Sequence, residues 1–151
     1  MKEFEILEHT ADIGIAAYGK TKKEVFINAA KGMCYIITED KREFKENFSH
    51  HIRLTAENLE NLLVAWLSEL LYLGETKLVV FNRFKIEELS DFQLSGKVYG
   101  KRIDQSGHKI KREVKAVTYH GLEVKKDKKN KLWRAQVIFD ILFVIFKIIS
   151  V

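Results

Sequence analysis

The sequence predicts an α+β fold in which two main helices pack on a mainly antiparallel β-sheet. Two segments with apolar residues at helical spacing lie in the first half of the chain, and strand-like segments separated by polar turns fill the second half. Two helices followed by a run of strands are typical of this class. With 151 residues and no Gly/Ser-rich linker, the chain is expected to form one folded domain.

The N-terminal segment FEILEHTADIGIAAYG, residues 4–19, is expected to form two short strands on either side of a polar corner. The helix that follows begins with TKKE, a capping box in which Thr21 caps the first turn and Glu24 reaches back to its backbone N–H. Helical spacing then predicts one buried face, made of Val25, Phe26, Ala29, Ala30, Met33, Ile36 and Ile37.

The second helix is predicted over residues 58–73, with Gly74 as its C-terminal stop. Its apolar stripe consists of Leu59, Leu62, Leu63, Trp66, Leu67, Leu70 and Leu71. Between the helices, HIRLT at residues 51–55 alternates like a strand. The remaining strands are expected over residues 78–81, 84–89, 92–103, 114–125 and 132–141.

Composition excludes few functions, but it indicates which partners and which cellular compartment are compatible with this chain. The net charge of +5 permits contact with RNA or an acidic protein, although part of it lies in KDKKNK, residues 126–131, which reads as a solvated hairpin loop. The single cysteine, Cys34, excludes an internal disulfide, suits a reducing cytoplasm and is expected to be structural. The first residues do not resemble a secretory signal, and the apolar end is shorter than the about 20 residues of a membrane span. These features predict a soluble, cytoplasmic protein.

Two polar positions are candidates for chemistry at the ends of strands. EHTAD, residues 8–12, places Glu8, His9 and Asp12 within five residues; it indicates either a turn that bonds its own backbone or ligands for a divalent cation. Asp140 stands in VIFDILFVIFKIISV with no other charge until Lys147. A carboxylate buried among such neighbours costs on the order of several kcal/mol, so it is expected to be paired, protonated or bound to a cation.

Weaker signals come from the second helix and from VKAVTYHG, residues 114–121. Glu69 interrupts the apolar helix and is more typical of a boundary position than of a carboxylate directed at a site. Strand alternation would place Lys115 and His120 on opposite faces, where neither carries much functional weight alone. Phosphate-loop, dinucleotide, hydrolase-elbow and cysteine-zinc motifs are absent from the sequence.

Five segments in order resemble the archease family. They are HTADIGI at 9–15, EVFINAAKGM at 24–33, LENLLVAWLSELLYL at 59–73, VKAVTYHGLEV at 114–124 and VIFDI at 137–141. The resemblance implies an archease-like domain over residues 1–141 and an apolar C-terminal extension over residues 142–151. It also implies a protein that is not itself an enzyme but activates the GTP-dependent tRNA-splicing RNA ligase. That ligase joins 2′,3′-cyclic phosphate or 3′-phosphate ends to 5′-hydroxyl RNA, and archeases promote its guanylylation and its multiple turnover.

The resemblance further implies a divalent cation site, with calcium preferred over magnesium or manganese. Its ligands would be Asp12, Asp140 and the chain end at Ile141, where archeases typically stop and offer a terminal carboxylate. This chain continues past Ile141, which puts that ligand in doubt, and the added apolar tail is expected to pack against something. Four further residues would surround the cation or contact the ligase: His9, Glu69, Lys115 and His120.

Two other functions compete with this interpretation. A metal-dependent hydrolase or nuclease could use the same carboxylates to activate water, although the sequence offers no third convincing carboxylate or general base near them. A nucleic-acid-binding or chaperone-like module would account for the positive charge and the apolar tail.

Overall fold

The computed structural model describes residues 2–8, 12–106 and 109–142. Within these ranges the chain alternates between strands and helices, and the α+β prediction is confirmed. The elements in order are β1 (Phe4–Glu8), β2 (Asp12–Gly19), α1 (Lys22–Thr38), β3 (Phe48–Thr55), α2 (Leu59–Lys77), β4 (Val79–Leu89), β5 (Gln93–Arg102), α3 (Ile103–Ser106), β6 (Val114–Val117), β7 (Glu123–Lys126) and β8 (Trp133–Ile141).

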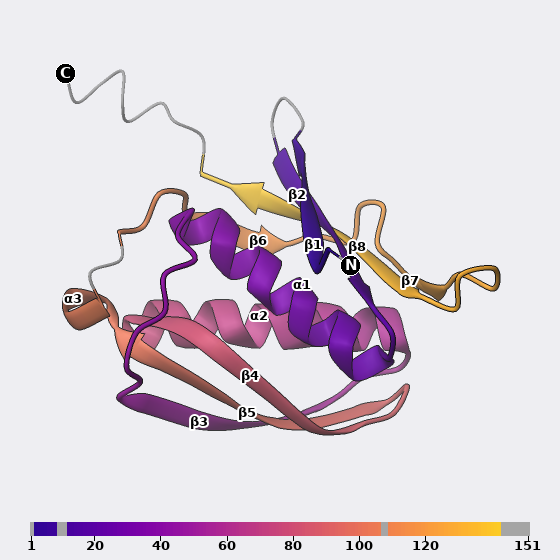
Figure 1. Cartoon of the computed structure of the whole chain (residues 1–151), viewed down its shortest axis with the longest axis horizontal. Coiled ribbons are helices and arrows are strands. Elements are labelled where there is room, and N and C mark those ends of the chain that lie inside the picture. The colour runs from indigo at the N-terminus through magenta and orange to yellow at the C-terminus, as the bar shows by residue number, and fades with distance from the viewer. Residues whose placement is uncertain (1, 9–11, 107–108, 143–151) are drawn as a thin grey trace.

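The strands form two sheets, and α1 and α2 lie between them (Figure 1). The first sheet has the order β1-β2-β8-β6, with β7 also pairing with β8, and the second has the order β3-β5-β4. Every strand pairing is antiparallel. The sequence predicted helices on a sheet but not its division into two layers. Because the helices fill the space between the layers, each sheet keeps one face directed away from them.

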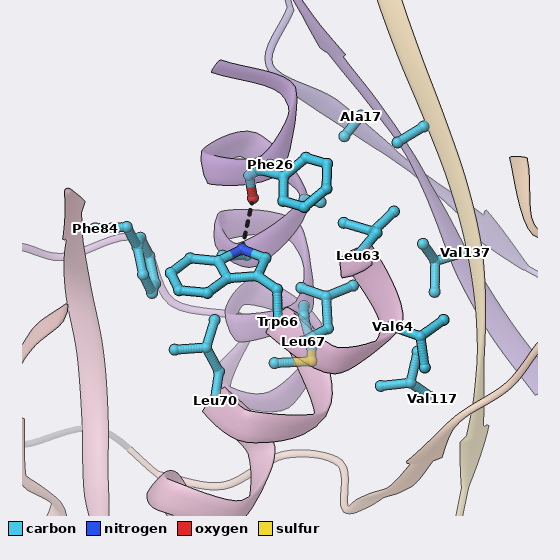
Figure 2. Close-up of a cluster of buried hydrophobic side chains, with 14 of the residues drawn as sticks. Ala17, Phe26, Leu63, Val64, Trp66, Leu67, Leu70, Phe84, Val117 and Val137 are labelled. Atoms are coloured by element: carbon cyan, nitrogen blue, oxygen red, sulfur yellow. Dashed lines mark hydrogen bonds between the residues drawn. The ribbon is translucent and has the colours of Figure 1, made fainter. Parts of the chain in front are cut away.

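Trp66 of α2 lies at the centre of the core (Figure 2). Its side chain is fully buried, and its indole Nε1 donates a hydrogen bond to the backbone oxygen of Phe26 in α1 at 3.0 Å. The indole also meets the ring of Phe84 in β4 edge-on, with ring centroids 6.2 Å apart. The Trp66 side chain therefore connects α2 with α1 and with the second sheet. Its buried N–H group is satisfied by the Phe26 oxygen.

The helices begin where the sequence predicts, but the second ends later. Thr21 accepts a hydrogen bond from the Glu24 backbone N–H at 3.1 Å, and Asn58 accepts one from Asn61 at 2.8 Å. The predicted stop at Gly74 is wrong, because α2 continues to Lys77. Leu78 instead adopts the left-handed conformation, with φ of 54°, and its N–H bonds to the Gly74 oxygen.

Two strand predictions are also wrong. The strands predicted over 78–81 and 84–89 are a single strand, β4, which begins at Val79 and in which the expected turn is an irregularity in register between Phe81 and Arg83. Residues 114–125 form two strands, β6 and β7, because a turn containing Gly121 at φ of 59° separates them.

Cys34 lines an apolar pocket of about 280 Å³ between α1, α2 and β4. Desolvation raises the pKa of its thiol to about 12, so almost no reactive thiolate exists near neutral pH, as expected of a structural cysteine. Among the described residues, no helix is both long and apolar enough to cross a membrane. Residues 143–151 lie outside the described ranges, so the packing of the apolar tail stays a prediction.

Candidate cation-binding site

Asp12 and Asp140 lie directly opposite each other on neighbouring strands. Asp12 opens β2, Asp140 lies next to the end of β8, and the two are Cα partners in the antiparallel register. Figure 1 shows β2 and β8 side by side in the first sheet. Directly opposed side chains point to the same face with Cβ atoms about 4.5–5.5 Å apart. Two ionised carboxylates at this separation repel each other unless a proton or a cation lies between them.

The pair lies on the face of the first sheet that is directed away from the helices. Ile13 and Phe139, the neighbours of the two aspartates along their strands, are buried in the core. Since side chains alternate along a strand, Asp12 and Asp140 point to the other side. Asp140 is therefore exposed, rather than buried among apolar neighbours as its sequence context suggested. The run of Val, Ile and Phe around it concealed the alternation.

The Asp12 carboxylate has one oxygen that is removed from water. Its Oδ1 atom is buried and has no hydrogen-bond partner in the described part of the chain. An unsatisfied buried carboxylate oxygen costs free energy, because it has lost its water without gaining a donor. A bound cation would satisfy this oxygen and would also relieve the repulsion from Asp140.

The chemistry of the two donors fits a hard divalent cation. Carboxylate oxygens are preferred by Ca²⁺ and Mg²⁺, whereas Zn²⁺ sites rely on nitrogen and sulfur. Within residues 2–8, 12–106 and 109–142 there is no cluster of three or more His, Cys, Asp or Glu side chains suited to a metal. The pair would therefore supply part of the coordination shell, with water, backbone oxygens or residues outside these ranges completing it. His9 is one such residue.

Ile141 follows Asp140 and pairs with Val114 of β6. Its chain continues into Leu142, whose N–H donates to the Glu113 oxygen at 2.9 Å. Ile141 therefore has no terminal carboxylate in this sequence. Any contribution from it to a cation would come from its backbone oxygen.

Lys115 lies in a β-bulge of β6, one residue before the partner of Asp140. Asp140 has Ala116 as its second Cα partner, and the register shifts between Val114 and Ala116, which leaves Lys115 as the extra, exposed residue of β6. The bulge also breaks the predicted alternation, since Val114 and Val117 are both buried. Bulges commonly redirect a side chain next to functional sites.

His120 and Glu69 are placed differently. His120 is exposed in the turn after β6, where its backbone N–H donates to Thr118 Oγ1 at 3.3 Å. Glu69 is half-buried on α2, between the two sheets, whereas the aspartates point away from the helices. The structure does not bring Glu69 into a cluster with Asp12 and Asp140 within the described residues.

Glu8 and Arg112 form an ion pair that the sequence did not indicate. The Arg112 guanidinium lies 3.9 Å from the Glu8 carboxylate and is also paired with Glu39 at the end of α1. The Glu8 carboxylate of EHTAD is thus paired with an arginine. No spacing signal links an arginine 104 positions away to this corner, so only the fold could reveal it.

Comparisons with known proteins agree with this architecture. Residues 4–141 match the model of the Archease protein family (MTH1598/TM1083). Protein archease of Methanosarcina barkeri is 42% identical over 144 residues, covering 93% of this chain and 97% of that protein. Protein archease of Pyrococcus furiosus is 39% identical, covering 93% and 100%.

Two solved structures share the fold. The solution structure of Methanobacterium thermoautotrophicum protein 1598 has a TM-score of 0.75 and 38% identity, and the match covers 93% of this chain and 99% of that one. The crystal structure of a Thermotoga maritima archease, described as a possible chaperone, has a TM-score of 0.60 at 21% identity and bears on the fold alone. The family match over nearly the whole chain and the identities of the relatives show that this chain belongs to the archease family.

Proposed function

We propose that this chain activates the GTP-dependent tRNA-splicing RNA ligase, promoting ligase guanylylation and repeated turnover. The observation that carries the proposal is the cross-strand pair of Asp12 and Asp140, in which a buried Asp12 oxygen has no hydrogen-bond partner within the described residues. Membership of the archease family supports the choice of partner. The chain would act as a protein cofactor in the cytoplasm, and the ligase would carry the catalysis.

The two aspartates would bind a divalent cation together, with calcium preferred, and each would have a different role. Asp12, with one oxygen buried, would fix the ion against the sheet, while the exposed Asp140 would present it outward. When bound, the cation would supply concentrated positive charge beside the phosphates of the ligase's nucleotide site. A corner preformed by strand pairing lowers the ordering cost when the two proteins meet.

Lys115 and His120 would contribute to the contact with the ligase. Both are exposed, and the β-bulge places Lys115 beside the strand position that pairs with Asp140. An ammonium group at that position could bind a phosphate or a carboxylate of the partner. His9 remains a proposed neighbour of the cation, acting through water.

A ligation assay with the ligase limiting tests this function. RNA with a 2′,3′-cyclic phosphate end, RNA with a 5′-hydroxyl end, GTP and manganese are incubated with ligase, with and without this protein. The proposal predicts about one joined product per ligase without the protein and a rise of about tenfold or more with it. A product yield that does not depend on the protein would contradict activation. RNA cleavage by the isolated protein would instead favour a hydrolase.

A further inference from the structure

The second sheet presents a basic face away from the helices. On its central strand β5, Leu94, Gly96, Val98 and Gly100 are buried, so Ser95, Lys97, Tyr99 and Lys101 point the other way. Figure 1 shows both long helices on one side of this sheet only. The helices do not cover the opposite face, which can contact solvent or a partner.

A row of basic side chains crosses this face. Lys97 of β5 is the Cα partner of Lys85 in β4 and of His51 in β3. Side chains so opposed lie about 4.5–5.5 Å apart, and like charges at this distance are unfavourable. In the part of the chain that the structure describes, neither Lys85 nor Lys97 has an acidic partner within ion-pair distance. An anion bound between the two lysines would relieve their repulsion.

Tyr99 and Arg83 add a stacking surface next to this row. The Arg83 guanidinium lies 3.6 Å from the Tyr99 ring centroid, and Lys97 lies 5.4 Å from it. Glu46 accepts two hydrogen bonds from Arg83, at 2.9 and 2.8 Å, which hold the guanidinium over the ring and lower the pKa of the Glu46 carboxyl. The Arg83 side chain remains 54% exposed. A guanidinium plane held in this way can stack with a nucleobase.

We propose that this face, made of Arg53, Arg83, Lys85, Lys97, Tyr99 and Lys101 and here called the basic sheet face, binds the backbone of single-stranded RNA. Alternate residues along a strand lie about 6.6 Å apart and neighbouring strands about 4.8 Å apart, so the cations form a grid that can follow an extended phosphate chain. Basic side chains around an aromatic group are typical of single-strand binding. The choice of RNA over another polyanion rests on the proposed function, whereas the binding itself needs no ligase.

The position of the basic sheet face separates it from the aspartate pair. It belongs to the second sheet, and Asp12 and Asp140 belong to the first, with the helices between them. RNA bound here would leave the cation site free for the ligase. The chain could therefore hold an RNA end and its ligase at the same time.

The test uses fluorescence anisotropy with a fluorescein-labelled oligouridine of about 12 nucleotides and the isolated protein at low salt. Lys85→Glu/Lys97→Glu reverses two charges on the basic sheet face, and Lys128→Glu/Lys129→Glu makes the same charge change in the exposed loop between β7 and β8. We expect the first variant to bind about tenfold more weakly or worse, with a reduced salt dependence, and the second to lose about twofold or less. Equal losses in both variants, or no RNA binding by the parent protein, would overturn the proposal.

Single-site variants test whether weaker RNA binding results from loss of stability or from the aspartate pair. Lys97→Glu turns its repulsion from Lys85 into attraction, so the variant should be at least as stable as the parent while binding RNA more weakly. Asp12→Asn should bind RNA like the parent even where ligase activation fails, which separates this proposal from the proposed function. If Lys85→Glu/Lys97→Glu keeps its RNA affinity but no longer activates the ligase, the face docks a protein and the RNA proposal is wrong.

Discussion

Replacing Asp12 by Asn should reduce activation of the ligase by about tenfold or more in the assay with limiting ligase. The Asp12 carboxylate has a buried oxygen without a hydrogen-bond partner in the described residues, opposite Asp140. The amide keeps the shape of the side chain but removes its negative charge, so the pair would no longer hold a hard cation. Asp140→Asn should show a similar loss, because each variant leaves one carboxylate.

A matched control for these variants is Asp91→Asn. Asp91 is a surface aspartate paired with Lys22 at 2.6 Å, away from the cation site, and exposed ion pairs of this kind contribute little to stability. We expect this variant to activate the ligase like the parent protein. Full activation by Asp12→Asn and Asp140→Asn would show that activation does not depend on the pair.

Replacing Trp66 by Ala should destabilise the fold by about 3–5 kcal/mol. The indole is fully buried, contacts Phe84 and donates to the Phe26 oxygen, so the change leaves a cavity and removes a hydrogen bond that joins α2 to α1. The midpoint of thermal unfolding should fall by roughly 10 °C or more. Circular dichroism or calorimetry measures this fall.

Tyr72 provides the control on the same helix. It is 60% exposed, and Tyr72→Ala should change the free energy of unfolding by less than about 0.5 kcal/mol. Trp66→Phe keeps an aromatic ring but removes the N–H donor. Its loss in the free energy of unfolding should lie between the losses of Tyr72→Ala and Trp66→Ala. A small effect of Trp66→Ala would mean that Trp66 does not join α1, α2 and β4 as described.

The sequence predicted the helices well because their signals are local. Thr21 and Asn58 begin helices through side chains only three residues from the N–H groups they bond, and the apolar stripes repeat within one element. The end of α2 depended instead on Leu78 adopting a left-handed conformation, which is uncommon for a residue with a branched side chain. The split of the strands into two sheets depended on pairings between distant segments, such as β2 with β8.

The same limit applies to the candidate site. The sequence singled out Asp12 and Asp140 separately. Only the pairing of β2 with β8 shows that the two residues lie opposite each other. Asp140 is exposed, although the apolar run around it suggested that it would be buried. The basic sheet face was hidden because its lysines and arginines lie on three strands and never form a charge run. The charge run that the sequence analysis identified was instead the KDKKNK loop, residues 126–131.

The central claim, that Asp12 and Asp140 together hold a divalent cation, is tested most directly by thermal unfolding of the parent protein and Asp12→Asn with calcium and with a chelator. In chelator, Asp12→Asn should be at least as stable as the parent, since the substitution removes the repulsion between opposed carboxylates. Calcium at about 100 times its dissociation constant should stabilise the parent by about 2.7 kcal/mol and leave Asp12→Asn unchanged. A parent protein whose midpoint does not respond to calcium, magnesium or manganese, or an equal response in both proteins, would contradict the claim.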